Sequence, residues 1–477
     1  MVARLSLLGA VLVGAALFAC SSLKSADSAP DGGGSLDDSG TPPANEDGSS
    51  PDGGSLPDGA VPDAGTPPVD FECATDPWTR IVKAKPECAP RQVKVVDATA
   101  PAAPTGVSIA RTTKGRVGIV YNAEQGSETG ELHLVHFTPT TATYPAPKLV
   151  KRATGFAFHD GYRTKLAAIG PDTLAVLSFD MDDNNRAGEV HLRKLVAGAE
   201  PLTDDLAMTG VADPTEIAVA VDAAGVVYAT ARVSTGATTA KLSARTKTAT
   251  GTFTSLPDVY NAFLPKQAPG LGATSLFVDP NNQLHLLFHQ NEVMQHSTPR
   301  YHSLDGTLWS YRKTIDNAVV DGLSGYSPRI ATFGTKKYAA FFFRKALQGN
   351  PVTADLRLAS WDAAADVPVI QIVDQGIPSV DPLYPEYRVA LAVDKFGLVH
   401  LAIVRPTSGT TGYLEYRRQT RVSGGGTKWL SDIVDPDVVS NLSSAFVDLV
   451  VDENARPHIA YRSARDGLVK YATRFDR

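Results

Sequence analysis

One unit of sequence recurs along most of this chain at a nearly constant spacing. In its last copy an apolar run ends at Asp452, a short polar turn follows, and a second apolar run begins around His458. After an Arg-Asp-Gly turn, alternating apolar residues up to Thr473 add a third strand-like segment. Because strands of this length joined by tight turns pair with their neighbours, we predict that each unit folds as an antiparallel meander.

The number of copies and their spacing predict the architecture. A period of about 50 to 60 residues with about four strands per unit is typical of a radial β-propeller, in which neighbouring sheets bury one another's faces. We therefore predict an all-β fold, a seven-bladed propeller of four-stranded antiparallel blades. Its first strands are expected to begin near residues 107, 165, 217, 275, 328, 388 and 446.

The two ends of the repeat region complement each other. The last unit contains only three strands, whereas residues 91–96 form a strand-like run without a meander of its own. We predict that this run is the missing fourth strand of the final blade. Pairing the two ends in this way would close the ring and remove an open sheet edge. The propeller would then span residues 91–477.

The N-terminus has the pattern of an export signal over residues 1–19. Arg4 precedes an apolar run that is too short to span a bilayer. The run Leu17-Phe18-Ala19-Cys20 resembles the lipobox of bacterial lipoproteins, which implies that Cys20 is lipidated, with palmitate among its acyl chains, and anchors the protein to a membrane. An ordinary signal peptide with an incidental cysteine is the alternative. Ser21 implies, by the same resemblance, sorting to the outer membrane of the cell envelope.

Residues 20–72 differ in composition from everything that follows. They are rich in Pro, Gly, Asp and Ser, and residues 21–72 contain eleven acidic side chains against the single Lys24. Such a segment cannot bury enough apolar surface to offset the entropy of ordering, so we predict a disordered acidic linker. The rest of the chain is nearly neutral and offers no basic field for nucleic acid.

Two cysteines remain once Cys20 is assigned to lipidation. Cys73 and Cys88 lie close together in the sequence, and the export signal places them in an oxidising compartment. We therefore predict a disulfide that ties the N-terminal loop 73–90. Two free or metal-bound thiols are the alternative.

The repeats resemble a known superfamily. The segment 451–461, Val-Asp-Glu-Asn-Ala-Arg-Pro-His-Ile-Ala-Tyr, and the following Gly-Leu-Val-Lys-Tyr-Ala are similar to repeats of bacterial propellers in the sialidase-like, BNR-repeat superfamily. The resemblance covers most of residues 105–474. The Asp-box of that superfamily, Ser-x-Asp-x-Gly-x-Thr-Trp, is only echoed at 303–309 and 423–429, each one residue short. The resemblance implies the scaffold, and this departure favours a non-catalytic member.

Arginines and tyrosines near the strand ends form the candidate ligand site. Arginines stand at the ends of second strands, on the face that carries the strand 2–3 and strand 4–1 loops, where they could bind carboxylates or sulfates of an acidic glycan. Tyrosines before first strands could stack on sugars or form a protein hot spot. The alternatives are ion pairs with neighbouring aspartates and packing between blades. The candidates are Arg232, Arg344, Arg405, Arg462, Tyr162, Tyr326 and Tyr387.

Two other patterns raise the question of metal binding. His285, His400 and His458 share one repeat position, so they cannot converge on one metal, and we predict packing and hydrogen-bonding roles. Asp180, Asp182 and Asn184 place oxygen atoms at alternating positions, as calcium loops do. A plain polar hairpin loop is the alternative there, and we expect no other cofactor.

These patterns together predict a monomeric, envelope-anchored lipoprotein that binds a glycan or protein ligand through the loop face of its propeller. A carbohydrate-active enzyme, either a sialidase-like glycoside hydrolase or a polysaccharide lyase, is the alternative. An enzyme is expected to gather acids, bases or metal ligands on that face, including a close carboxylate pair for glycoside hydrolysis. A structural component of an envelope assembly, with a broad apolar patch, is a third possibility.

Overall fold

In the computed structural model all described residues lie within Ala64–Arg477, the second of the two units into which the chain divides. The predicted signal peptide, Cys20, the acidic linker and the Cys73–Cys88 pair lie outside the described residues. Among the described residues there is no helix with the length and hydropathy that crossing a membrane requires. The structure describes residues 92–97, 106–124, 130–139, 146–152, 164–181, 187–196, 203–212, 217–234, 239–265, 274–293, 296–305, 308–316, 322–345, 353–362, 367–378, 389–407, 411–423, 425–438, 446–463, 465 and 467–473.

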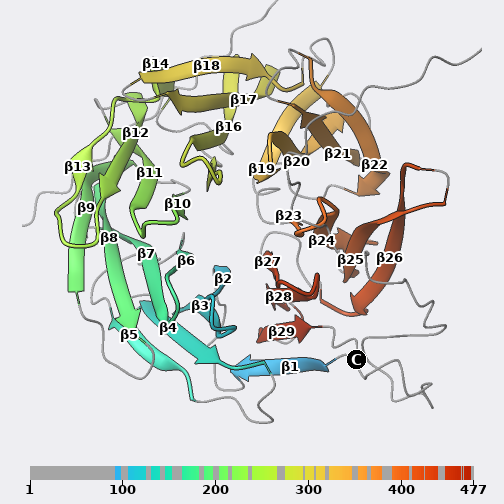
Figure 1. Ribbon diagram of the computed structural model, residues 1–477, viewed down its shortest axis with the longest axis horizontal. Helices are drawn as coiled ribbons and strands as arrows, with labels where there is room; N and C mark the ends of the chain where they lie inside the picture. The colour runs from blue at the N-terminus through green and yellow to red at the C-terminus, as the bar shows by residue number, and fades with distance from the viewer. Residues whose placement is uncertain are drawn as a thin grey trace, which may run out of the picture. The chain divides into compact units, whose positions relative to one another are not determined.

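The regular elements of this part of the chain are all β-strands, arranged as successive antiparallel meanders in an all-β propeller (Figure 1). The first strands of the meanders are β2 (Val107–Arg111), β6 (Lys165–Ile169), β10 (Ala218–Val221), β15 (Thr274–Val278), β19 (Gly322–Phe333), β23 (Val389–Val393) and β27 (Val447–Val451). The second strands are β3 (Val117–Glu124), β7 (Thr173–Met181), β11 (Val227–Ser234), β16 (Leu284–Val293), β20 (Lys336–Lys345), β24 (Val399–Pro406) and β28 (Pro457–Arg462).

The remaining strands complete the meanders. The third strands are β4 (Gly130–Phe137), β8 (Ala187–Val196), β12 (Thr239–Lys247), β17 (His296–Asp305), β21 (Thr353–Trp361), β25 (Gly412–Arg421) and β29 (Val469–Thr473). The strands beyond them are β5 (Lys148–Arg152), β9 (Thr203–Ala212), β13 (Thr254–Ser255) with β14 (Tyr260–Pro265), β18 (Leu308–Thr314), β22 (Val369–Pro378), β26 (Thr427–Asp435) and β1 (Gln92–Asp97).

Hydrogen bonding groups these strands into five sheets. Three sheets have four strands, and the other two have eight and nine because single residue pairs bridge adjacent meanders, Val233 with Val211 and Ser297 with Leu323. Successive first strands contact one another in chain order, and β27 contacts β2. In Figure 1, β6, β10 and β23 lie on the inner side of their sheets, and β9, β22 and β26 lie on the outer side.

The two ends of the described chain meet in one sheet. Strand β1 pairs antiparallel with β29, with Gln92 opposite Thr473 and an irregularity between Val95 and Asp97. The strand predicted over 91–96 is therefore present at 92–97 and lies next to the last meander. Asp448 of β27 adds a second link, since its Oδ2 accepts hydrogen bonds from Ser108 Oγ (2.8 Å) and the backbone N–H of Ile109 (3.0 Å).

The turns between first and second strands follow from the repeated aspartate. Oδ1 of Asp452 accepts hydrogen bonds from the backbone N–H groups of Asn454 (2.8 Å) and Arg456 (2.9 Å). The residue between them, Ala455, has φ 61°, a left-handed conformation that is unfavourable for alanine. The aspartates at 222, 279 and 394 make the same pair of hydrogen bonds, and Gly225, Asn282 and Gly397 hold the equivalent left-handed position.

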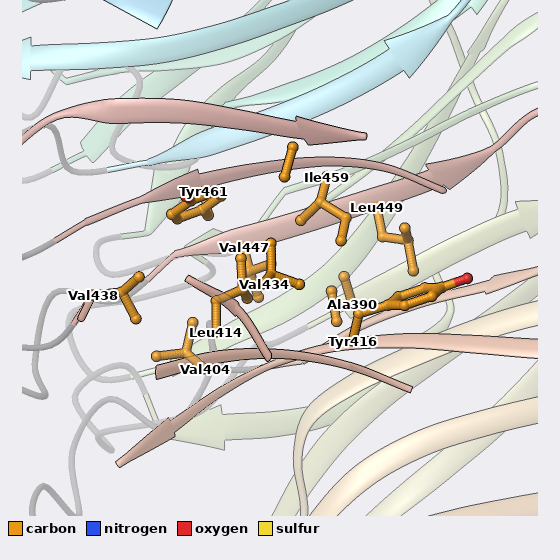
Figure 2. Packing of buried hydrophobic residues seen from close by; sticks show 12 residues of the cluster. Ala390, Val404, Leu414, Tyr416, Val434, Val438, Val447, Leu449, Ile459 and Tyr461 are labelled. Atoms are coloured by element: carbon orange, nitrogen blue, oxygen red, sulfur yellow. The ribbon is translucent and has the colours of Figure 1, made fainter. Parts of the chain in front are cut away.

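The core lies between neighbouring sheets rather than within one sheet. Figure 2 shows one such interface, where Leu414 and Val434 of one meander pack with Leu449 and Ile459 of the next. These side chains are fully or almost fully buried. Because each sheet contributes apolar side chains to the clusters on both of its faces, no meander can bury its own core alone.

Candidate functional site

Each repeat histidine lies in a buried triad, hydrogen-bonded to a tyrosine and close to the turn aspartate. His285 Nδ1 lies 2.7 Å from the hydroxyl of Tyr301, and its Nε2 lies 3.2 Å from Asp279 Oδ2. This arrangement confirms the predicted hydrogen-bonding role. The same contacts link His400 to Tyr416 (2.5 Å) and Asp394 (3.1 Å), and His458 to Tyr471 (2.6 Å) and Asp452 (3.7 Å).

In two of the triads the pKa of the turn aspartate is lowered. Burial alone would raise the pKa of Asp452, but the nearby imidazole of His458 and the hydrogen bonds from the turn amides more than offset it, so the pKa is lowered. The pKa of Asp394 is lowered in the same way, with His400 as the side-chain donor. In the part of the chain that the structure describes, no group of three or more His, Cys, Asp or Glu side chains could hold a metal ion.

The four candidate arginines are not equivalent. Their positions along the second strand can be counted from the repeat position held by His458, His400 and Tyr228. Arg462 and Arg232 each lie four residues after it, whereas Arg405 lies five residues after it. The exposed fraction is 1% for Arg232, 5% for Arg344 and 6% for Arg462, but the side chain of Arg405 is 23% exposed. Of these four, Arg405 alone has a partly exposed side chain.

Arg405 belongs to a network of charged side chains, which we call the Arg405 network and which comprises Asp374, Arg405, Glu415, Arg417 and Ser431. Arg405 Nη1 pairs with Asp374 and lies 3.8 Å from Glu415. Arg417 Nη2 lies 2.9 Å from Asp374 Oδ2, and its Nε donates to Glu415 at 2.8 Å. Ser431 Oγ also donates to Glu415. The two guanidinium groups therefore balance two largely buried carboxylates.

Part of this network belongs to a recurring structural device. Asp374 lies in β22, whereas Arg417 lies in the third strand of the following meander. Comparable pairs link a carboxylate of one meander to the third strand of the next, namely Asp205–Lys247 (3.4 Å), Asp316–Arg357 (2.6 Å) and Asp435–Lys470 (3.1 Å). Asp374–Arg417 is thus the structural pair, and Arg405 and Glu415 are additions to it.

Tyr413 lies next to this network. It is directly opposite Arg405 in the pairing of β24 with β25, so the two side chains lie on the same face of the sheet. Glu415 and Arg417 follow at alternating positions on that face. The pKa of Tyr413 is raised, mainly by burial, with Glu415 adding to the effect and Arg405 opposing it. A half-buried aromatic ring and a partly exposed guanidinium are therefore neighbours at the loop end of this sheet.

A second charged cluster surrounds Arg193 in β8. Arg193 Nη2 lies 2.7 Å from Asp180 Oδ2 and 3.1 Å from Asp204 Oδ2. His191 lies 2.8 Å from Asp204 and 3.1 Å from Glu189. The pKa of Arg193 is raised, because the two aspartates outweigh the effect of burial, and the pKa of Asp204 is lowered.

One of the predicted calcium ligands, Asp180, belongs to this second cluster. Asp180 already accepts hydrogen bonds from Arg193 and from Ser178 Oγ (3.0 Å). Asp182 and Asn184 lie outside the described residues, so the calcium loop stays a prediction.

The tyrosine candidates are described only in part. Tyr162 and Tyr387 lie outside the described residues. The backbone of Tyr326 lies in β19 opposite Phe342, and its side chain lies outside the described part of the structure.

Sequence reasoning missed Asp374, Tyr413, Glu415 and Arg417. The alternation of Tyr413, Glu415 and Arg417 with Leu414 and Tyr416 in the third strand was the available signal.

Comparisons with known proteins find remote likenesses. No family model and no curated protein matches the chain. The fold is similar to that of a protein of unknown function from Dyadobacter fermentans (9% identity, 80% of this chain and 98% of that chain, TM-score 0.47). It is also similar to the α-L-arabinofuranosidase Arb93A of Fusarium graminearum (10%, 79% and 96%, TM-score 0.43) and to a Trypanosoma rangeli sialidase (10%, 80% and 58%, TM-score 0.41). These likenesses assign no activity to the chain.

Proposed function

We propose that this chain is an envelope lipoprotein whose propeller binds an acidic glycan or protein ligand at the loop face around Arg405. In this proposal Cys20 carries the lipid anchor, residues 20–72 form the linker, and a Cys73–Cys88 disulfide ties the loop that precedes the propeller. Sorting to the outer membrane and the lipid anchor rest on the sequence patterns alone.

The propeller in this proposal has seven blades. The larger sheets of eight and nine strands each contain two meanders joined by a single residue pair, which supports counting them as two blades each. Contacts between successive first strands, and between β27 and β2, support a closed ring. The pairing of β1 with β29 supports closure by the N-terminal strand.

The observation that carries the binding proposal is the partial exposure of the Arg405 side chain, whose guanidinium is held by ion pairs. Both ion-pair contacts of Arg405 use Nη1, and a guanidinium has five N–H donors, so Nε and Nη2 retain capacity for a carboxylate or sulfate. Asp374 and Glu415 hold the group in position, which reduces the entropy that ligand binding would otherwise cost. Tyr413 adds a ring that a sugar can stack against.

The proposal is tested with a glycan array that includes uronic-acid-containing and sulfated polysaccharides. The full-length chain is compared with Arg405→Ala and with Arg465→Ala. Arg465 is a matched control, because it is an arginine with 61% of its side chain exposed, paired with Asp437, in the strand 2–3 loop of the next meander. Binding that is lost in Arg405→Ala and kept in Arg465→Ala supports the site. Binding that both variants keep contradicts it.

A carbohydrate-active enzyme is a second candidate, favoured by one observation. Arg417 Nη2 lies 2.9 Å from Asp374 and 3.2 Å from Glu415, so two carboxylates are close neighbours beside Tyr413. The contacts of these carboxylates argue against an enzyme. Their oxygens already bind guanidinium groups and a hydroxyl, whereas an acid catalyst needs a carboxyl oxygen that can reach the substrate. Incubating any glycan bound on the array with the protein, and following new reducing or unsaturated ends, separates the two functions. Turnover abolished by Glu415→Gln would favour the enzyme.

A further inference from the structure

Strand β22 has one edge without a partner strand in the described part of the chain. It pairs with β21 along one edge only, from Val369 opposite Ser360 to Pro378 opposite Thr353, and it is the last strand of its sheet. The backbone N–H and C=O groups of the other edge can be satisfied by water or by another strand. A protein segment that paired with this edge would be an extended strand.

The same strand exposes apolar side chains on both of its faces. Four of the nine exposed large hydrophobic side chains of the described residues lie between positions 367 and 372. Within the strand Val369 is 70% exposed, while Ile370 and Ile372, which point to the other face, are 37% and 44% exposed; Val367, just before the strand, is 76% exposed. A partner strand here would bury apolar surface on both sides of the extended sheet.

Strand β22 also lacks the basic side chains that four other outer strands carry. Residues 367–373 contain no charged side chain, and Asp374, which follows, is paired with Arg417. In contrast, β1, β5, β18 and β26 each contain at least one Lys or Arg, the residues that usually prevent edge-to-edge pairing. A second copy of β22 running antiparallel would therefore place no like charges opposite each other.

We propose that β22 is a dimerisation edge, at which two copies of this chain pair antiparallel about a two-fold axis. Such an interface is self-complementary, because each copy contributes the same uncharged, β-branched segment to both faces of the joined sheet. The interface replaces the monomer expected from the sequence. It does not depend on ligand binding at Arg405.

The test is the oligomeric state of the full-length chain, measured by sedimentation velocity over a concentration series in a detergent that keeps any lipid anchor soluble. The wild-type chain is expected to be a dimer in reversible exchange with monomer. The variant I370K/I372K is expected to dissociate at least ~10-fold more readily, because the new lysines lie opposite each other in the pair. Leu206→Lys, which changes an exposed leucine on the outer strand β9, is the matched control and should keep the dimer.

A second measurement locates the contact independently of stability. Gln371→Cys places a thiol near the centre of the uncharged segment, where antiparallel pairing brings the two copies of this residue together. Rapid intermolecular disulfide formation by this variant, with none in the wild-type chain, supports the edge. A monomeric wild-type chain up to ~100 μM, well above the concentrations at which specific dimers form, overturns the proposal, as does a dimer that I370K/I372K leaves unchanged.

Discussion

His458 Nδ1 lies 2.6 Å from the hydroxyl of Tyr471, and both side chains are almost completely buried. The contact joins the second and third strands of the last meander, and Asp452 on the other side of the imidazole joins it to the first turn. One buried triad thus fixes the relative positions of three segments. The recurrence of this triad in two other meanders identifies it as part of the scaffold.

Removing the tyrosine hydroxyl from this triad should destabilise the protein. Tyr471→Phe leaves the buried His458 Nδ1 with only its longer contact to Thr473 Oγ1 (3.4 Å), and a poorly satisfied buried polar group typically costs about 1 to 3 kcal/mol. Urea denaturation of the wild-type chain and the variant measures the loss. Tyr228→Phe is the control, because its hydroxyl is only partly buried and makes a longer contact with Asp222 (3.3 Å). A loss at Tyr471 no larger than at Tyr228 would argue against a structural role of the triad.

The left-handed turn residue Ala455 gives a stabilising substitution. Ala455→Gly removes the strain of a Cβ at φ 61° and should raise the free energy of unfolding by about 0.5 to 1 kcal/mol, less the cost of a more flexible unfolded chain. The reverse change, Gly397→Ala, should destabilise by more than strain alone, since the new Cβ would lie 2.8 Å from the ring of Phe333. Thermal unfolding of both variants shows whether each substitution raises or lowers the stability. A destabilising Ala455→Gly would contradict the assigned turn.

The buried imidazole of His302 should make stability depend on pH. Its pKa is lowered from 6.5 to about 4, first by burial and then by Arg300. Above pH 6.5 the group is neutral in both folded and unfolded chains and has no effect. As the pH falls from 6.5 to 4 the unfolded chain takes up the proton first, so stability is lost by at most about 1.4 kcal/mol per pH unit.

His302→Gln removes this contribution while keeping a polar side chain of similar size. The difference in unfolding free energy between the variant and the wild-type chain, measured at pH 7, 6 and 5, should shift in favour of the variant as the pH falls. An unchanged difference across this range would show that His302 is not held neutral by burial.

Much of the fold was predictable because its signals are local. The Asp turns, the strand alternation and the repeat period place six of the seven first strands within one residue of the expected starts. The exception is β19, which begins at Gly322 instead of near 328, because irregular pairing around Tyr326 extends it beyond the repeat. The strand propensity of the residues and the period of the repeat describe only the regular unit, so they cannot predict such an extension.

The candidate site was much less predictable because its contacts are not local. Asp374 contacts Arg417 from a different meander. The pairing of β22 with β21 is irregular just before Asp374, and this irregularity determines the face of the sheet on which the Asp374 side chain lies. The difference between Arg405 and the other arginines depends on one- and two-residue shifts in where each stands along its strand. Burial of Arg232 and exposure of Arg405 follow from those shifts and from the packing of neighbouring meanders.

Substitutions of the two arginines of the Arg405 network should differ in their effect on the free energy of unfolding. Arg417→Ala leaves two largely buried carboxylates with one guanidinium and should destabilise the protein by about 3 kcal/mol or more. Arg405→Ala removes the partly exposed group, and the loss of unfolding free energy should be clearly smaller. Denaturation curves for both variants check this order, and equal losses would mean that Arg405 serves the fold as much as Arg417 does.

The central claim, ligand binding at Arg405, is tested most directly by equilibrium titration of one acidic glycan selected on the array into the wild-type chain, Arg405→Ala and Arg465→Ala. The account predicts that Arg405→Ala weakens the Kd at least ~10-fold, as the loss of a charge-assisted hydrogen-bonded contact does, while Arg465→Ala matches the wild type. Equal affinities for all three proteins, with Arg405→Ala folded, would contradict it.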